Sequence, residues 1–171
     1  MHAIAFWPTV VMVTIAAVAD VRTRRVPNWL VGPALLAGLL VHGVYEGMPG
    51  VGRSLQGVGL AVAVTAILYW LRSLGMGDLK LCSAVGAWIG PAQMVFALWA
   101  TAVAGGVLAV AYAIRHGVLL QTVARTGTVL AHVVRNGPRP HPTLNLDNPA
   151  AVKMPYAVPI AVGTIFSFYT Q

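Results

Sequence analysis

The stretch Gly75-Met76-Gly77-Asp78-Leu79-Lys80 lies between two long apolar runs, in a chain of 171 residues with only four acidic residues. A carboxylate at the edge of an apolar run is costly to bury, and such a residue is taken by default to mark a functional site. The glycines at 75 and 77 permit a tight turn and a close approach to another segment. A second aspartate, Asp20, ends the first apolar run. The sequence therefore predicts one site built from two carboxylates, with the other helices arranged around it.

The composition is that of a membrane protein. Hydrophobic residues make up 58% of the chain and charged residues 9%, whereas a soluble domain carries about 25% charged residues. We expect an all-α, polytopic membrane protein in which residues 1–171 form a single integral-membrane domain. The net charge of +7 does not indicate a nucleic-acid partner, because basic residues beside membrane helices set topology and meet anionic lipid.

The sequence carries no motif for a metal or a cofactor. The lone cysteine, Cys82, excludes an internal disulfide and a multi-cysteine zinc site, and the five histidines are scattered. No phosphate-binding loop, dinucleotide fingerprint or nucleophile elbow is present. We expect no cofactor and no metal, and we expect Cys82 to be a small core residue.

Hydropathy and charge predict about six transmembrane helices with the N-terminus outside. No Lys or Arg precedes the first apolar run, while three arginines follow it, which is the reverse of a cleavable signal peptide. The short segment 79–89 would span only about 16 Å as a helix. It is counted as a crossing because otherwise the basic region after it would lie outside. The predicted spans are 3–19, 29–44, 54–71, 79–89, 94–114 and 155–170.

The segments between the spans are assigned by their basic residues. Residues 21–28, 72–78 and 115–153 are predicted to be cytoplasmic, and the turn-rich segment 45–50 to be outside. Within 115–153, residues 117–135 place Leu119, Val123, Leu130 and Val134 near one helical face, with Gln121, Arg125, His132 and Arg135 away from it. This pattern predicts a helix that lies on the membrane surface, followed by an irregular linker over 136–142.

Each candidate site residue has a structural alternative. Asp78 could be the N-cap of its helix, where aspartate is favoured, and Asn28 could cap the helix after Pro27. Asp20 lies at the negative end of a helix dipole, which ion pairs with Arg22 and Arg24 could offset. Lys80 could neutralise Asp78, bind lipid phosphate or only set topology. Glu46 and Asp147 are predicted to be solvated loop residues.

Two carboxylates at the same membrane edge also have a chemical interpretation. When two carboxylates are close, one holds a proton and the other does not, which gives an acid and a base near neutral pH. With water, that pair is what peptide hydrolysis by two aspartates requires.

Three motifs of the chain resemble those of the type IV prepilin peptidases, which are aspartyl proteases with a GxGD motif. The first is Asp20-x-Arg22-x-x-x-Val26-Pro27-Asn28, and the second is Gly75-x-Gly77-Asp78-x-Lys80. The third is Met154-Pro155-Tyr156-Ala157-Val158-Pro159, which is similar to the stretch that opens the last span in that family. Ala157 stands where family members commonly carry glycine.

The resemblance implies a function, a substrate and a location. Asp20 and Asp78 would be catalytic, with Gly75, Gly77, Lys80, Arg22, Pro27, Asn28, Pro155 and Tyr156 as supporting motif residues. The substrate would be a prepilin or pseudopilin whose short basic leader is cut before a hydrophobic helix, at the cytoplasmic face of the bacterial inner membrane. The chain is similar to the short form found with tight-adherence (Flp) pili. Two other functions stay open, a proton-coupled carrier that uses the aspartate pair and a non-catalytic pilus-assembly protein.

Overall fold

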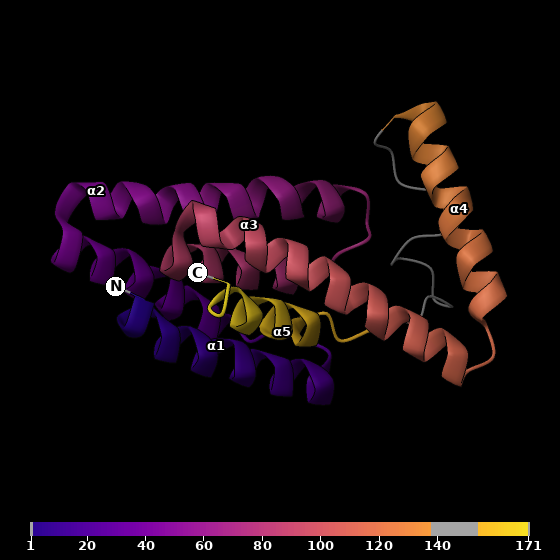
Figure 1. The fold of residues 1–171 in the computed structure, drawn as a ribbon, viewed down its shortest axis with the longest axis horizontal. Helices are drawn as coiled ribbons and strands as arrows, with labels where there is room; N and C mark the ends of the chain where they lie inside the picture. The colour runs from indigo at the N-terminus through magenta and orange to yellow at the C-terminus, as the bar shows by residue number, and fades with distance from the viewer. Residues whose placement is uncertain (1, 138–153, 171) are drawn as a thin grey trace.

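The structure, a computed structural model, describes residues 2–137 and 154–170. Within those residues the chain is all-helical (Figure 1), which confirms the predicted fold class. The helices are α1 (His2–Thr23), α2 (Asn28–Trp70), α3 (Met76–Arg115), α4 (Leu119–Asn136) and α5 (Ala157–Ser167).

Helices α2 and α3 each fold back on themselves at one glycine (Figure 1). Gly47 has φ 65° and ψ −152°, and Gly90 has φ 70° and ψ 178°, which are backbone conformations that essentially only glycine adopts. Each turn is closely followed by a proline, Pro49 or Pro91, and proline suits the start of a helix because it needs no N–H donor there. The predicted outer segment 45–50 is therefore not an extended loop, since one residue reverses the chain.

The two hairpins and the two flanking helices account for all six segments predicted as spans. Three helices, α1 from Ile4, α2 and α3, are long and apolar enough to cross a membrane, and the protein is accordingly a membrane protein. The arm that contains 79–89 begins at Met76 and ends at the Gly90 turn, which makes it about 21 Å long. How many of the six arms cross the bilayer stays a prediction.

Helix α3 is the centre of the bundle, because it contacts every other helix described. Its first arm meets the second arm of α2 at two glycines, where a Cβ on Gly57 would overlap the backbone of Gly86 and the reverse. Small residues let membrane helices approach this closely. Gly163 of α5 meets Thr101 on the second arm of α3 in the same way. These contacts set the spacing between the helices.

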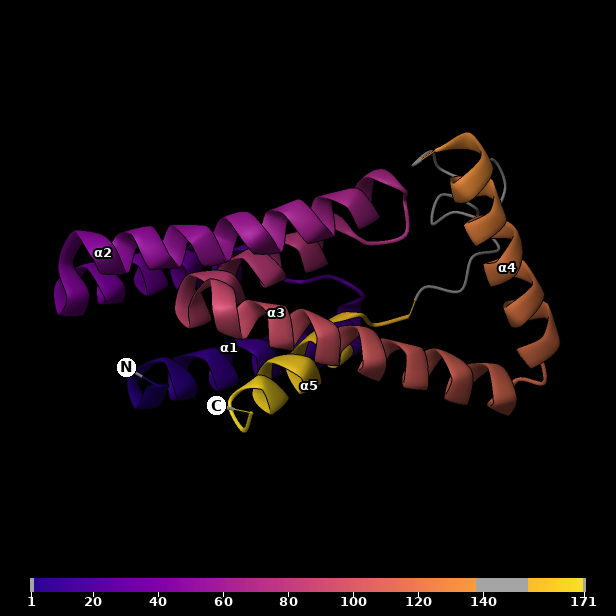
Figure 2. The ribbon, with the colours of Figure 1, turned by 45° about the horizontal axis from the view of Figure 1, so that its top comes forward.

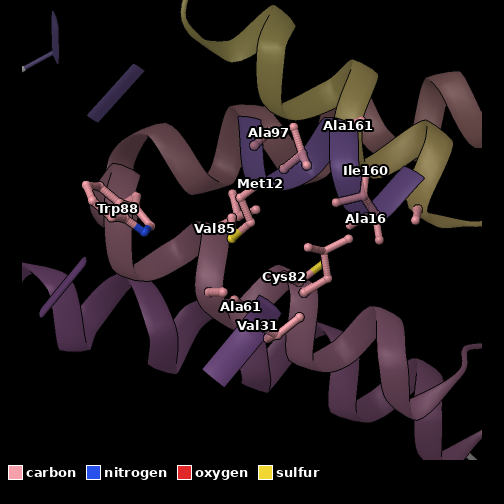
Figure 3. Packing of buried hydrophobic residues seen from close by; sticks show 14 of the residues in the cluster. Met12, Ala16, Val31, Ala61, Cys82, Val85, Trp88, Ala97, Ile160 and Ala161 are labelled. Carbon is pink, nitrogen blue, oxygen red and sulfur yellow. The ribbon is translucent and has the colours of Figure 1, made fainter. Parts of the chain in front are cut away.

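The buried core lies where the four bundle helices meet (Figure 3). Cys82 is 3% exposed within this core, as predicted. The cluster includes Met12 and Ala16 from α1, Val31 and Ala61 from α2, Val85, Trp88 and Ala97 from α3, and Ile160 and Ala161 from α5.

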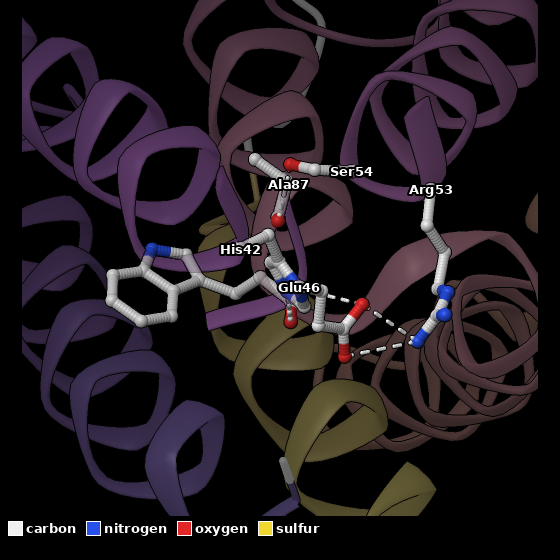
Figure 4. Close-up of polar contacts among 6 residues, drawn as sticks. His42, Glu46, Arg53, Ser54 and Ala87 are labelled. Atoms are coloured by element: carbon white, nitrogen blue, oxygen red, sulfur yellow. Dashed lines mark hydrogen bonds and ion pairs between the residues drawn. The ribbon is translucent and has the colours of Figure 1, made fainter. Parts of the chain in front are cut away.

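Polar side chains of α2 donate hydrogen bonds to two backbone carbonyls at the end of the first arm of α3 (Figure 4). Pro91 has no N–H, so the carbonyl of Ala87 lacks its usual helical donor. The Ser54 hydroxyl donates to that carbonyl at 2.6 Å, and His42 Nε2 donates to the next carbonyl, that of Trp88, at 3.0 Å. The turn in α3 is thus held by both arms of α2.

The same end of α2 carries an ion pair that the sequence prediction missed. Arg53 lies 3.0 Å from Glu46 across the Gly47 turn (Figure 4). The Glu46 side chain is only 17% exposed, so the prediction that it is a solvated loop residue was wrong.

Helix α4 stands apart from the bundle in both ribbon views (Figures 1 and 2) and, among the helices described, contacts only α3. It is helical as predicted, and its apolar residues Leu120 and Val123 are 86% and 62% exposed. Its position on a membrane surface stays a prediction. Asp147 and most of the predicted linker over 136–142 lie outside the described residues.

Candidate functional site

Asp20 lies in the last turn of α1 and is only 7% exposed. It does not end its helix, which continues to Thr23. Its Oδ2 accepts a hydrogen bond of 3.1 Å from the backbone N–H of Ala157, the first residue of α5. The first N–H groups of a helix have no helical partner and carry partial positive charge. The N-terminus of α5 therefore stabilises this carboxylate. The predicted partners were Arg22 and Arg24, and Arg22 is exposed.

Asp78 is the third residue of α3, and the N-cap of this helix is Gly75. The prediction that Asp78 could be the N-cap was therefore wrong. Its carboxyl instead accepts a hydrogen bond from the Gly75 backbone N–H, as the acidic residue of a capping box does. A Cβ at Gly75 would lie 3.1 Å from Asp78 Oδ2, so glycine leaves room for the carboxylate.

The two carboxyl groups lie within electrostatic reach of one another. Asp78 precedes the predicted membrane segment 79–89. Burial, and then the negative charge of Asp20, raise the pKa of Asp78 to about 6, while the hydrogen bond from Gly75 opposes the rise. The negative charge of one carboxylate favours the protonated form of the other, so Asp78 keeps its proton to a higher pH than a free aspartate does. The helix that carries Asp20 and the one that carries Asp78 are separated in the sequence by the whole of α2.

The segment after α1 lies against the start of α3. A Cβ on Gly77 would come within 3.2 Å of the Cβ of Val26, so the predicted close approach of a glycine is present. Gly75 has φ −78°, so the turn before α3 does not use the left-handed backbone that glycine permits at this position. Among the described residues, positive φ is found at four other glycines and at Arg24 and Arg72.

Lys80 connects the first two motifs. Its Nζ donates a hydrogen bond of 3.1 Å to Oδ1 of Asn28, a partner that none of the three predicted roles for Lys80 included. Asn28 is the first residue of α2 and Pro27 is the N-cap, without a side-chain capping bond. The predicted cap at Asn28 was therefore wrong, and its side chain binds Lys80 instead.

The third motif lies beside the other two. Tyr156 is the N-cap of α5, and the charge of Asp78 reaches its hydroxyl. The carbonyls of Pro155 and Tyr156 accept hydrogen bonds from Val158 and Ile160, which shape the first turn of α5. The group that contacts Asp20 is the backbone N–H of Ala157, so alanine in place of the common glycine keeps this donor.

Sequence reasoning missed the N–H groups of Ala157 and Gly75 at the site, because a backbone donor leaves no residue-type signal. Only the expected helix start after Pro155 pointed to unpaired N–H groups there. Among the described residues, no group of three or more His, Cys, Asp or Glu could hold a metal ion. What the site offers chemically is two carboxyl groups, one buried and held by a helix N-terminus and one with a raised pKa.

Comparison with known proteins gives one match. The model of the "Type IV leader peptidase family" matches residues 7–110, a range that contains Asp20 and Asp78 and ends before Tyr156. No curated protein and no solved structure matches the chain.

Proposed function

The chain belongs to the type IV leader peptidase family, and from this premise we propose that it cuts the short basic leader from a prepilin or pseudopilin by an aspartyl mechanism. The observation that carries the proposal is the buried Asp20, held by the N-terminus of α5 within electrostatic reach of Asp78. Burying one carboxyl group beside another is costly, and strongly shifted pKa values of this kind cluster at functional sites.

The protonation states suggest which carboxyl plays which role. Asp78 is the candidate acid, because burial and then the charge of Asp20 raise its pKa to about 6, so that it keeps its proton to a higher pH than a free aspartate does. Asp20, whose carboxylate accepts the Ala157 N–H, takes a proton from water, whose oxygen attacks the scissile carbonyl carbon. Asp78 donates its proton to the carbonyl oxygen as the tetrahedral intermediate forms. As the C–N bond breaks, the amine takes up the proton that Asp20 accepted, and one hydroxyl of the intermediate returns a proton to Asp78 as the new carbonyl forms.

The motif residues support the two carboxyl groups in this proposal. Lys80 and Asn28 join the starts of α3 and α2, and Gly77 lets Val26 approach. Pro155 and Tyr156 set the first turn of α5 and hence the Ala157 donor. Arg22, which is exposed, is proposed to face the cytoplasm and anionic lipid.

We further propose that the site faces the cytoplasm of a bacterium, in a multi-pass inner-membrane protein of one domain over residues 1–171. The basis is the positive-inside rule. With Cys82 as its single cysteine, the chain resembles the short form that serves tight-adherence (Flp) pili.

Co-expression with a prepilin tests the proposed activity. The prepilin should shift to mature size on a gel in the presence of the protein and stay at full length in its absence. A prepilin that stays at full length, while the peptidase is present and folded in the membrane, would contradict the proposal. Such a result would leave the carrier and assembly functions.

A further inference from the structure

A groove of about 280 Å³ lies between the second arm of α3 and the start of α5. Residues along one side of α3 form one wall, and the entry to α5 forms the other. Its lining is apolar apart from Arg115 and the tyrosine hydroxyls, and includes Gly105, Leu108, Tyr112, Arg115, Tyr156 and Pro159.

The entry to α5 links the groove to the two carboxyl groups. Tyr156 lines the groove and lies within reach of the charge of Asp78. The next residue, Ala157, donates its N–H to Asp20. A substrate bound at the carboxyl groups would therefore pass close to the groove.

We propose that this groove holds the apolar segment that follows the scissile bond of the substrate, an inference that rests on the proposed function. The groove is too small for a whole helix, which is about 10 Å across, and it suits a few apolar side chains. Arg115 repels a basic leader, and the two carboxyl groups attract it. The charges therefore assign the leader to the side of Asp78 and the apolar segment to the groove.

Gly105 gives the groove its depth. A Cβ there would meet the Pro159 side chain at 3.8 Å, which is ordinary contact. The missing side chain at this position leaves room in the groove for an apolar side chain of the substrate. A lipid acyl chain is the other candidate occupant, and crosslinking distinguishes the two.

Photo-crosslinking in the whole protein tests the occupant. Benzoylphenylalanine replaces Leu108, which lines the groove, or Val107, which does not and is 63% exposed. Both are placed in an Asp78→Asn background, so that a co-expressed prepilin stays uncut. Position 108 should crosslink to the apolar segment of the prepilin, and position 107 should not. Equal crosslinking from both positions, or only lipid adducts at 108, would overturn the groove assignment.

Kinetics give a second, independent readout. Gly105→Leu fills the groove and should raise KM about tenfold with little change in kcat, because it removes binding made before the chemical step. Gly106→Leu is the matched control, since a Cβ at Gly106 meets nothing within 4 Å, and it should leave KM unchanged. An unchanged KM in Gly105→Leu would contradict the groove. If the wild type cuts prepilin but neither test gives the expected result, the assignment of the groove is wrong and the peptidase proposal is unaffected.

Discussion

At the scale of single residues, Asp20 and Asp78 lie at opposite ends of their helices, and a different hydrogen-bond donor stabilises each buried or partly buried carboxyl group. Asp20 lies at the end of α1, where the dipole is unfavourable, and receives the N–H of Ala157 from another helix. Asp78 lies at the start of α3, where the dipole is favourable, and receives the N–H of Gly75 from its own turn. Their mutual repulsion remains, and it has a measurable consequence.

Replacing Asp78 by Asn should stabilise the protein at high pH. The pKa of Asp78 rises from 3.8 to about 6 on folding, so ionisation costs stability as the pH rises through about 6. Asp78→Asn should raise the melting temperature at pH 8, because Asn still accepts a hydrogen bond but has no charge. The gain should shrink below pH 6 and vanish below 3.8. Thermal unfolding in one detergent at pH 8 and pH 3.5 measures it; an equal shift at both pH values would contradict the raised pKa.

Gly77 is the residue whose size controls the approach of the first motif. Gly77→Val should impair cleavage severely, because even a Cβ comes within 3.2 Å of Val26 and the branched side chain is stiff. Gly59→Val is the control in an equally helical position, where a Cβ meets nothing within 4 Å. Prepilin cleavage by the two folded variants makes the comparison. A normal rate in Gly77→Val would show that this contact does not position Asp78.

At the scale of helices, the fold depends on how α3 turns at Gly90 and Pro91. The turn frees the carbonyl of Ala87, and Ser54 on the second arm of α2 supplies the donor. This break falls between two of the predicted spans, 79–89 and 94–114. The donor could not be found from the sequence, because Ser54 and Ala87 belong to different hairpins and nothing in either stretch specifies their pairing.

Removing the Ser54 hydroxyl should destabilise the bundle. Ser54→Ala leaves a buried carbonyl without a donor, which costs about 1–2 kcal/mol. Ser73→Ala is the control, since that hydroxyl is exposed and makes a weak bond of 3.4 Å to Leu71; it should change stability by less than about 0.5 kcal/mol. Denaturant titration in mixed micelles measures the free energy of unfolding of both variants. Equal values would show that water or the backbone donates to the Ala87 carbonyl in the absence of Ser54.

At the scale of the whole molecule, the predicted topology rests on the distribution of the basic residues. Every Lys and Arg except Arg53 falls in or beside a segment predicted to be cytoplasmic. Arg53 lies at the predicted outer end, where it pairs with Glu46 at the Gly47 turn. The topology stays a prediction.

Labelling of single cysteines in a Cys82→Ala background tests this topology. A cysteine at position 45, where Tyr45 is 64% exposed, should react with an impermeant reagent in intact cells. A cysteine at position 125, in exposed α4, should react only after the cells are opened. Reaction at 125 in intact cells would reverse or break the six-span assignment.

Much of this molecule could be predicted from its sequence, and what could not has a physical reason. Apolar runs and basic loops located all six helical segments, and the two aspartates stood out because a carboxylate is rare beside hydrocarbon. The capping roles predicted for Asp78 and Asn28 were wrong. The residue at which a helix begins depends on tertiary contacts, which the local sequence does not show. The Ala157 donor and the Glu46–Arg53 pair were missed because each depends on three-dimensional proximity.

The central claim, that Asp20 and Asp78 act as one catalytic unit, is tested most directly by prepilin cleavage with Asp20→Asn, Asp78→Asn and the double variant. All three should be folded by gel filtration, because Asn is nearly isosteric. Each single variant should lose at least about 100-fold in rate, and the double variant should be no slower than the singles because parts of one unit are not additive. Substantial cleavage by either single variant would contradict the dyad and the aspartyl mechanism with it.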